Sequence, residues 1–241
     1  MTTSSLPQWV LIAGVGFCIP GMRAQQAPGF AFGESGLSQP IPDNDPSGIA
    51  RTYRASGLAV GIPYDLEVSL SVEPIGLGAF NGDYYAYLIH ESPSGSDFRL
   101  SVLMNRVGAT AETPNGYSDS GFRFTFSDFA PKDVHQYRVS FGDPQSALVS
   151  GTWQPDGRMV DPLVSLDTSP RTAFLSPLGQ MDPNGQWTLF VADMEAGGTG
   201  KLTGWEVRAV PSVPVIPEPS STLMLGIGWV IWTACRRRPS E

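Results

Sequence analysis

Positive charge, histidine and cysteine are scarce in this chain. Its 241 residues include 15 lysines and arginines against 23 aspartates and glutamates, which gives a formal net charge of −8. Lys132 and Lys201 are the only lysines. Nucleic-acid binding requires a basic footprint, so the composition predicts that nucleic acid is not a partner. An acidic surface is compatible with calcium binding and also with simple solubility.

The two cysteines, Cys18 and Cys235, lie in apolar segments near opposite ends of the chain. If both ends are removed, the remaining domain has no cysteine and therefore no disulfide. This outcome is compatible with export, because a domain of this size can be stable without disulfides.

Catalytic motifs are also missing. The only histidines are His90 and His135, and neither stands in a histidine-glycine strand motif. The chain has no Gly-Thr-Ser nucleophile block, no H-E-x-x-H, no Cys-x-x-Cys and no glycine-rich phosphate loop. We therefore expect no enzymatic activity, and we expect both histidines to be exposed or at strand edges.

Long apolar runs of helical period are absent between the two terminal segments, whereas glycine (27) and proline (22) are frequent. The sequence contains strand patterns instead of helical ones. Apolar and polar residues alternate from Asp65 to Glu73, and Phe122, Phe124 and Phe126 form a second alternating stripe. Val139 and Phe141 indicate a further strand. These patterns predict an all-β protein.

The stretch from Met181 to Val210 contains two further strand patterns. A turn at Asp182–Gly185 precedes a short apolar run at Trp187–Ala192, and alternation resumes at Trp205–Ala209 after a glycine-rich connection. The pattern predicts a β-hairpin that closes a β-sandwich.

This stretch resembles the end of the P-domain (P/Homo B), the β-rich domain that follows the catalytic domain of proprotein convertases and some bacterial subtilases. The matching pattern is Asn-Gly-x-Trp-x-Leu-x-Val-x-Asp at 184–193, followed by Gly-x-Gly-x-Leu-x-x-Trp-x-Val at 198–207. Four earlier blocks match in the same order, at 41–49, 82–95, 103–108 and 122–130. The resemblance implies a jelly-roll-like β-sandwich of two antiparallel sheets over residues 40–210.

The resemblance also implies a structural calcium ion. Calcium binds several oxygen ligands from carboxylates and carbonyls, and loops at one end of a sandwich can supply them. Asp128 and Asp193 stand in the matching blocks and are the better candidates, while Asp43 and Asp45 are the weaker ones. The alternative is that these aspartates cap turns through hydrogen bonds to nearby backbone groups.

The N-terminus has the pattern of an export signal over residues 1–24. Trp9–Ile19 forms an apolar core too short to span a bilayer, and Ala24 could end a site for signal peptidase. No lysine or arginine precedes this core, which departs from the usual pattern. Residues 25–39 are rich in glycine, alanine and serine and predict a flexible leader.

The C-terminus carries three consecutive signals. Residues 211–219 form a proline-rich linker that ends in Pro217-Glu218-Pro219, residues 220–235 form an apolar transmembrane helix, and residues 236–241 form a basic cytoplasmic tail. The arginines of the tail are Arg236, Arg237 and Arg238. This order resembles the PEP-CTERM sorting signal of Gram-negative bacteria, which implies processing by an exosortase at the inner membrane.

Together these patterns predict a non-catalytic, exported protein of the cell surface or extracellular matrix. The P-domain-like sandwich would serve as an interaction module. Two alternatives stay open: a P-domain accessory of a serine-type peptidase system, and a carbohydrate-binding module. For the latter, Tyr84, Tyr85 and Tyr87 would form the platform, and extracellular polysaccharide would be the partner.

Overall fold

A computed structural model describes residues 28–76, 78–141 and 148–212. The predicted signal segment, the Pro217-Glu218-Pro219 motif, the apolar segment at 220–235 and the three arginines lie outside these ranges. Within them, no helix has the length and apolar character needed to cross a membrane.

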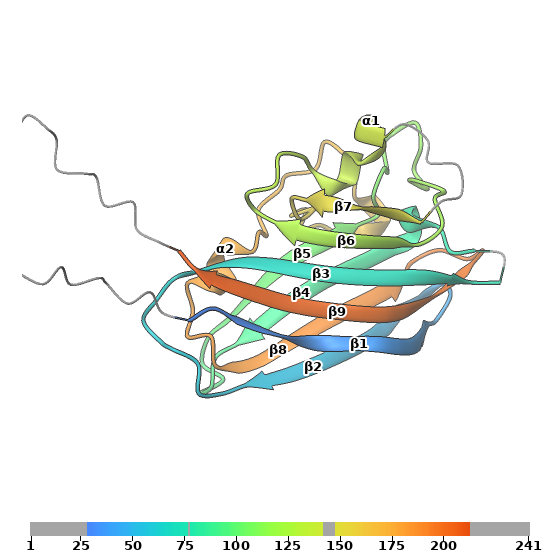
Figure 1. The fold of residues 1–241 in the computed structure, drawn as a ribbon. Helices are drawn as coiled ribbons and strands as arrows, with labels where there is room; N and C mark the ends of the chain where they lie inside the picture. The colour runs from blue at the N-terminus through green and yellow to red at the C-terminus, as the bar shows by residue number, and fades with distance from the viewer. Residues whose placement is uncertain (1–27, 77, 142–147, 213–241) are drawn as a thin grey trace, which may run out of the picture.

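The described chain folds into two β-sheets, which confirms the prediction of an all-β protein with two sheets (Figure 1). The five-stranded sheet has the order β1 (Phe30–Ile41), β9 (Thr199–Pro211), β3 (Tyr64–Ile75), β6 (Phe122–Ser127) and β7 (Val149–Trp153). The four-stranded sheet has the order β2 (Asp45–Ala55), β8 (Gly185–Asp193), β4 (Tyr84–Glu91) and β5 (Phe98–Asn105).

One strand pair departs from the predicted antiparallel arrangement. Strands β6 and β7 run parallel, with Phe122 opposite Val149 and Phe126 opposite Trp153. Parallel neighbours need a long crossover, and the chain between Ser127 and Val149 is long enough to return to the same end of the sheet. The prediction of two wholly antiparallel sheets is therefore wrong at this pair.

The helices are all short. They are the 3₁₀ turns η1 (Asn81–Asp83), η2 (Val134–Gln136) and η3 (Pro162–Val164) and the single-turn helices α1 (Arg138–Phe141) and α2 (Ser176–Gly179). Helix α1 occupies the place where Val139 and Phe141 predict a strand, so that prediction is wrong. The Asp133 side chain accepts the His135 N–H and caps η2, which starts this segment in a helical conformation. Val139 is exposed.

Alternation along the strands builds the core between the sheets. From Tyr64 to Glu73, the even positions of β3 are buried and the odd positions half-exposed, and all three phenylalanines of β6 are buried, as the sequence predicts. Rings from both sheets meet inside: Phe32 of β1 lies 5.5 Å from Trp187 of β8. Full burial of one such side chain contributes about 1.5–3 kcal/mol to folding.

Strand β1 corrects the predicted leader at 25–39. From Phe30 onward these residues pair with β9, with Phe32 opposite Val207. Phe32 is buried, and its ring stacks on that of Tyr53 at 4.4 Å. A register shift between Ser35 and Gln39 interrupts the alternation of this strand. Without a regular strand pattern, only the glycine-, alanine- and serine-rich composition remains, and it predicts a leader.

The predicted closing hairpin is also corrected. Strands β8 and β9 form where the sequence predicts them, but they do not pair with each other. Strand β8 pairs with β2 and β4, whereas β9 pairs with β1 and β3 in the other sheet. Residues 194–198 therefore carry the chain from one sheet to the other, across a gap of about 10 Å.

Candidate functional site

His90 lies inside the sandwich rather than at an exposed edge. It belongs to the inward-facing side of β4 and is fully buried. Its ring stacks on Trp187 at 3.8 Å with an interplanar angle of 8°, and Nε2 lies 3.1 Å from the carbonyl oxygen of Asn184. Burial lowers the pKa of this imidazole. The prediction of an exposed histidine is wrong here.

His135 is buried as well, in a group of polar side chains outside the main core. Its Nδ1 lies 2.9 Å from Oδ2 of Asp156, and Oδ1 of that carboxylate accepts a hydrogen bond from Arg158 at 3.1 Å. In a serine-protease triad the second nitrogen faces the nucleophile. Here Nε2 lies 3.0 Å from the carbonyl oxygen of Ala109, so this histidine–aspartate pair joins loops.

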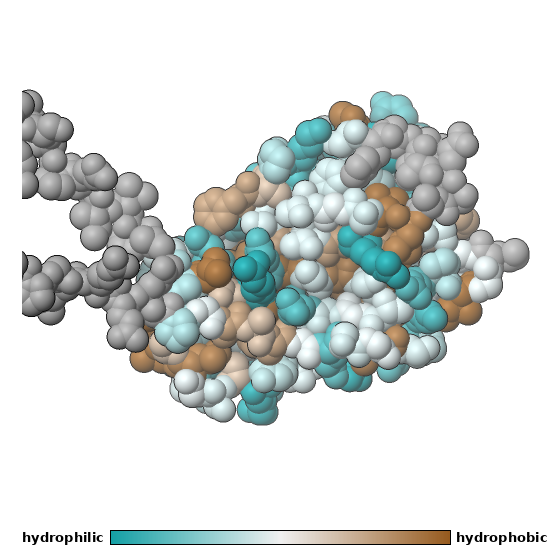
Figure 2. All heavy atoms as spheres, viewed as in Figure 1, coloured by the Kyte–Doolittle hydropathy of each residue, from teal (hydrophilic) through white to brown (hydrophobic). Residues whose placement is uncertain are grey.

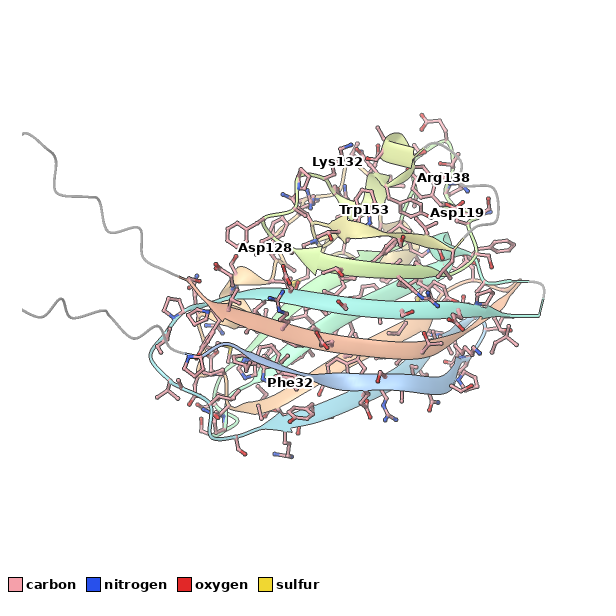
Figure 3. All side chains as sticks on the ribbon, viewed as in Figure 1. Phe32, Asp119, Asp128, Lys132, Arg138 and Trp153 are labelled. Carbon is pink, nitrogen blue, oxygen red and sulfur yellow. The ribbon has the colours of Figure 1, made fainter. Side chains whose placement is uncertain are left out.

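Asp128, a predicted calcium ligand, acts as a cap at the end of β6 (Figure 3). Its two carboxylate oxygens accept hydrogen bonds from the backbone N–H groups of Leu175 and Ser176, at 3.0 and 2.7 Å, and from the Ser176 hydroxyl. These bonds tie β6 to the start of α2. The bonded backbone groups lie 47 and 48 residues away in sequence, so this is a tertiary contact and not the local turn cap of the alternative.

Asp193, the second predicted ligand, is fully buried at the end of β8. Its Oδ1 accepts the Glu195 N–H at 3.3 Å, while Oδ2 is buried with no hydrogen-bond partner among the described residues. Burial raises the pKa of this carboxyl to about 7, with nearby Asp83 adding to the effect. Burial likewise raises the pKa of Asp83 to about 6.

Asp43 and Asp45 lie at the same end of the molecule as Asp193. Asp45 is paired with Asp193 across β2 and β8, and it accepts the Ser47 N–H at 2.9 Å. Asp43 accepts the Gly197 N–H at 3.2 Å. Asp45 therefore caps its own turn, whereas Asp43 joins the turn before β2 to the connection between β8 and β9. In the described ranges no group of three or more histidine, cysteine or acidic side chains is arranged to hold a metal ion.

Asp128 and Asp193 lie at opposite ends of the sandwich. Ser127 pairs with Glu67 near the start of β3, whereas β9, which follows Asp193, begins opposite Ile75 at the end of β3. The stretch of β3 from Glu67 to Ile75 spans on the order of 25 Å. The two carboxylates therefore cannot share one ion, and a calcium site at Asp193 would need other ligands.

Aromatic side chains gather on the outer face of the four-stranded sheet. Tyr85 and Tyr87 of β4 point outward and are half-buried, and Phe190 lies opposite Tyr87 on β8. The Tyr87 and Phe190 rings stack at 4.7 Å, and the Tyr85 ring lies 5.5 Å from that of Tyr87. Tyr84, the third tyrosine predicted for this platform, is instead fully buried in the core.

The aromatic cluster forms the floor of a pocket of about 540 Å³. The walls come from Asn44 and the start of β2 and from the η3 segment, and they add the apolar residues Pro46, Pro162 and Leu163 and the polar residues Asn44 and Asp161. Met194, which follows β8, completes the lining. Sequence reasoning missed Phe190 and both walls. The alternation of Phe190 with Leu189 and Val191 marks it as outward-facing, but only the register places it beside Tyr87.

The outer face of the five-stranded sheet is more polar than that of the four-stranded sheet. The middle of the five-stranded sheet carries pale and teal residues in Figure 2, which reflects serine, threonine and charged side chains on β3, β6 and β9. Ser69 and Thr125 hydroxyls lie 3.2 Å apart across two of these strands. The aromatic pocket therefore distinguishes the four-stranded sheet as the better candidate for a binding surface.

No family model and no curated protein matches this chain. Among solved structures, it is similar to a serine protease of Aeromonas sobria, described both alone and in complex with the chaperone ORF2. Identity is 16% and 14%, the TM-scores are 0.34 and 0.35, and the matches cover 78% and 79% of this chain. The chain spans 27% of the length of those proteins. Similarity at this level supports no inference about activity.

Proposed function

We propose that this chain is a non-catalytic, exported protein of the cell surface or extracellular matrix, with the sandwich as its interaction module. The observation that carries the proposal is the aromatic-floored pocket on the outer face of the four-stranded sheet. Aromatic and apolar walls with two polar side chains are typical of binding sites. Both histidines are occupied inside the protein, so neither is placed beside this pocket to act as a base.

The proposed relation to P-domains agrees with the strand order. Eight strands divide four and four, with β1, β9, β3 and β6 in one sheet and β2, β8, β4 and β5 in the other. Except for the β4–β5 pair, which stays in one sheet, successive strands of these eight alternate between the sheets in the manner of a jelly roll, and β7 adds an edge. Jelly rolls serve many functions, so this order supports the resemblance in fold and leaves function to the site.

A pull-down from native extracellular polymer tests the proposal. Residues 25–212, immobilised through the C-terminal end, should retain matrix material that an unrelated β-sandwich of similar charge does not retain. Failure to retain anything from the matrix of a native host would contradict the proposed interaction function. If the same domain instead cleaves casein in a manner that depends on His135, the peptidase alternative replaces it.

Calcium binding remains part of the proposal in a narrower form, centred on Asp193 without Asp128. A ligand that binds only the native state raises its stability in proportion to RT ln(1 + [L]/Kd). The test is thermal unfolding with millimolar calcium and with chelator. A higher midpoint in calcium that is abolished by Asp193→Asn would support the site, and equal midpoints would contradict it.

A further inference from the structure

We infer that the aromatic-floored pocket binds a neutral polysaccharide chain, with Tyr85, Tyr87 and Phe190 packing against the sugar rings. The inference rests on the proposed function and specifies its ligand. Three aromatic rings on two adjacent strands give the pocket a rigid, partly exposed apolar floor. Aromatic side chains are favoured where a ligand is apolar on one side and wet on the other, which describes the C–H face of a sugar.

The walls supply the groups that sugar hydroxyls need. Asn44 offers an amide donor and acceptor, and Asp161 offers carboxylate oxygens. Oδ1 of Asp161 accepts the Leu163 N–H at 2.9 Å, which holds this side chain at the start of η3. The volume of about 540 Å³ lies within the range of about 300–1,000 Å³ typical of small-molecule sites.

Charge excludes the anionic ligands. Neither lysine nor arginine stands among the described residues that line the pocket, while Asp161 contributes negative charge. The whole chain carries a net charge of −8. Phosphate groups, nucleic acids and uronic-acid polymers would therefore be repelled, and a neutral chain fits best.

A proline-rich peptide is the competing occupant, because such peptides also dock in aromatic-lined grooves. Proline has no N–H to donate. Bound against Asp161, a proline-rich segment would remove water from carboxylate oxygens without replacing their hydrogen bonds, which costs free energy. A sugar hydroxyl can donate to the same oxygens, so the polar wall favours the polysaccharide.

The experiment measures binding of the folded chain to soluble polymers by isothermal titration calorimetry. The probes are neutral xyloglucan, glucomannan and hydroxyethyl cellulose, acidic alginate and polygalacturonate, and a polyproline peptide. We expect binding to at least one neutral polymer, with affinity reduced about tenfold or more by Tyr87→Ala and by Tyr85→Ala. Two separate variants keep the test valid if one of them fails to fold.

Phe98→Ala is the matched control. Phe98 is 65% exposed and lies opposite Glu91, on the same outer face but at the far end of β4. This variant should bind the neutral polymer as the wild type does. Binding only to acidic polymers, binding only to the peptide, no binding to the neutral polymers, or equal binding by Tyr87→Ala would each overturn the inference.

The pull-down separates this inference from the proposed function. If the wild type and Tyr87→Ala retain the same native matrix material, the pocket is not the binding site although the interaction function stands. If the wild type retains nothing, the proposed function fails together with the inference.

Discussion

Two carboxyl groups, one buried without a partner for one oxygen and one hydrogen-bonded, affect the free energy of folding in opposite directions. Asp193 is buried with one oxygen unpartnered, and the pKa of its carboxyl rises to about 7. Glu34 accepts hydrogen bonds from Arg51 and Trp205, at 2.8 and 2.9 Å, and the pKa of its carboxyl falls to about 2. Ionisation therefore opposes folding at Asp193 and favours it at Glu34.

The first prediction concerns Asp193→Asn. Because the folded-state pKa lies above the unfolded value near 4, this carboxyl lowers stability progressively as pH rises through about 7. The neutral amide removes that cost, so the variant should be more stable than the wild type at pH 8, by about 1–3 kcal/mol. The gain should disappear near pH 4. Urea unfolding in chelator at both pH values measures it.

A loss of stability at pH 8 would contradict this account and would indicate that the carboxylate is needed in its charged form. Asp45→Asn is the matched control, since Asp45 stands opposite Asp193 at the same end and is only half-buried. The gain at pH 8 should be larger in Asp193→Asn than in this variant, because Asp193 is fully buried.

The second prediction concerns Glu34→Gln. The Glu34–Arg51 pair joins β1 to β2 and so joins the two sheets at one edge. Its contribution is present above the unfolded pKa near 4.5 and is lost as pH falls through about 2. Because both side chains are about one-third exposed, we expect a cost of only about 1 kcal/mol at pH 7, shrinking toward pH 2.

Denaturant midpoints of wild type and variant across pH 2–7 test this. Glu67→Gln is the control, because the Glu67–Arg208 pair lies on the exposed face of one sheet and should contribute about 0–0.5 kcal/mol. A constant difference between Glu34→Gln and the wild type over the whole range would exclude the carboxylate charge as its cause.

At the scale of elements, β1 is the strand whose role differs most from the sequence prediction. It covers β9 along one edge and brings Phe32 into the core beside Trp187. The close approach of the two strands depends on Gly33, where a Cβ atom would meet the Trp205 carbonyl oxygen at 2.1 Å. This element is therefore part of the sandwich.

The third prediction follows from this role. A chain that begins at residue 25 should unfold with the same midpoint as one that begins at residue 28. A chain that begins at residue 40 should lose about 3–5 kcal/mol or fail to fold, because it lacks Phe30 and Phe32 and exposes the edge of β9. Circular dichroism and thermal unfolding of the three chains decide the matter. Equal stability of all three would restore the prediction of a flexible leader.

At the scale of the whole molecule, the first and last described strands begin and end side by side, with Phe30 opposite Ala209. Figure 1 shows the chain entering at β1 and leaving at β9, two neighbouring strands of one sheet. Pro211 lies opposite Tyr64 at the end of β9. The aromatic pocket lies at the end of the sandwich that holds Asn44 and Met194. The described chain leaves from the other end, after Pro211.

The fourth prediction is that the exported protein loses both ends. We expect signal peptidase to remove residues 1–24 and an exosortase to cut near Pro217-Glu218-Pro219, which removes Cys235 and the three arginines. Moving an arginine through the bilayer centre costs about 2.5–3.5 kcal/mol on insertion scales, so the tail should first halt in the inner membrane. Intact-mass measurement on secreted protein from an exosortase-bearing host tests this. Retention of residues 236–241 in the secreted fraction would indicate a plain tail anchor.

Patterns in the sequence are enough to predict the all-β class and four of the nine strands of the described chain. Alternation of apolar and polar residues marks β3, β6 and β9, because side chains on a strand point to opposite faces and one face must be buried, and a short apolar run marks β8. The sequence also predicts the acidic turn residues at strand ends, and it names Tyr85 and Tyr87 as platform residues but includes the buried Tyr84 with them.

Which strands are neighbours and which side chains meet depends on how the two sheets assemble. Local periodicity indicates which way a side chain points, but it does not indicate which strand lies alongside. The sequence therefore predicts a hairpin of β8 and β9, although the two strands belong to different sheets. For the same reason the sequence predicts one calcium site for Asp128 and Asp193, although they lie at opposite ends of β3. The sequence also does not place Phe190 beside Tyr87. The binding pocket depends on contacts between residues far apart in sequence, and these contacts exist only when the sheets have assembled.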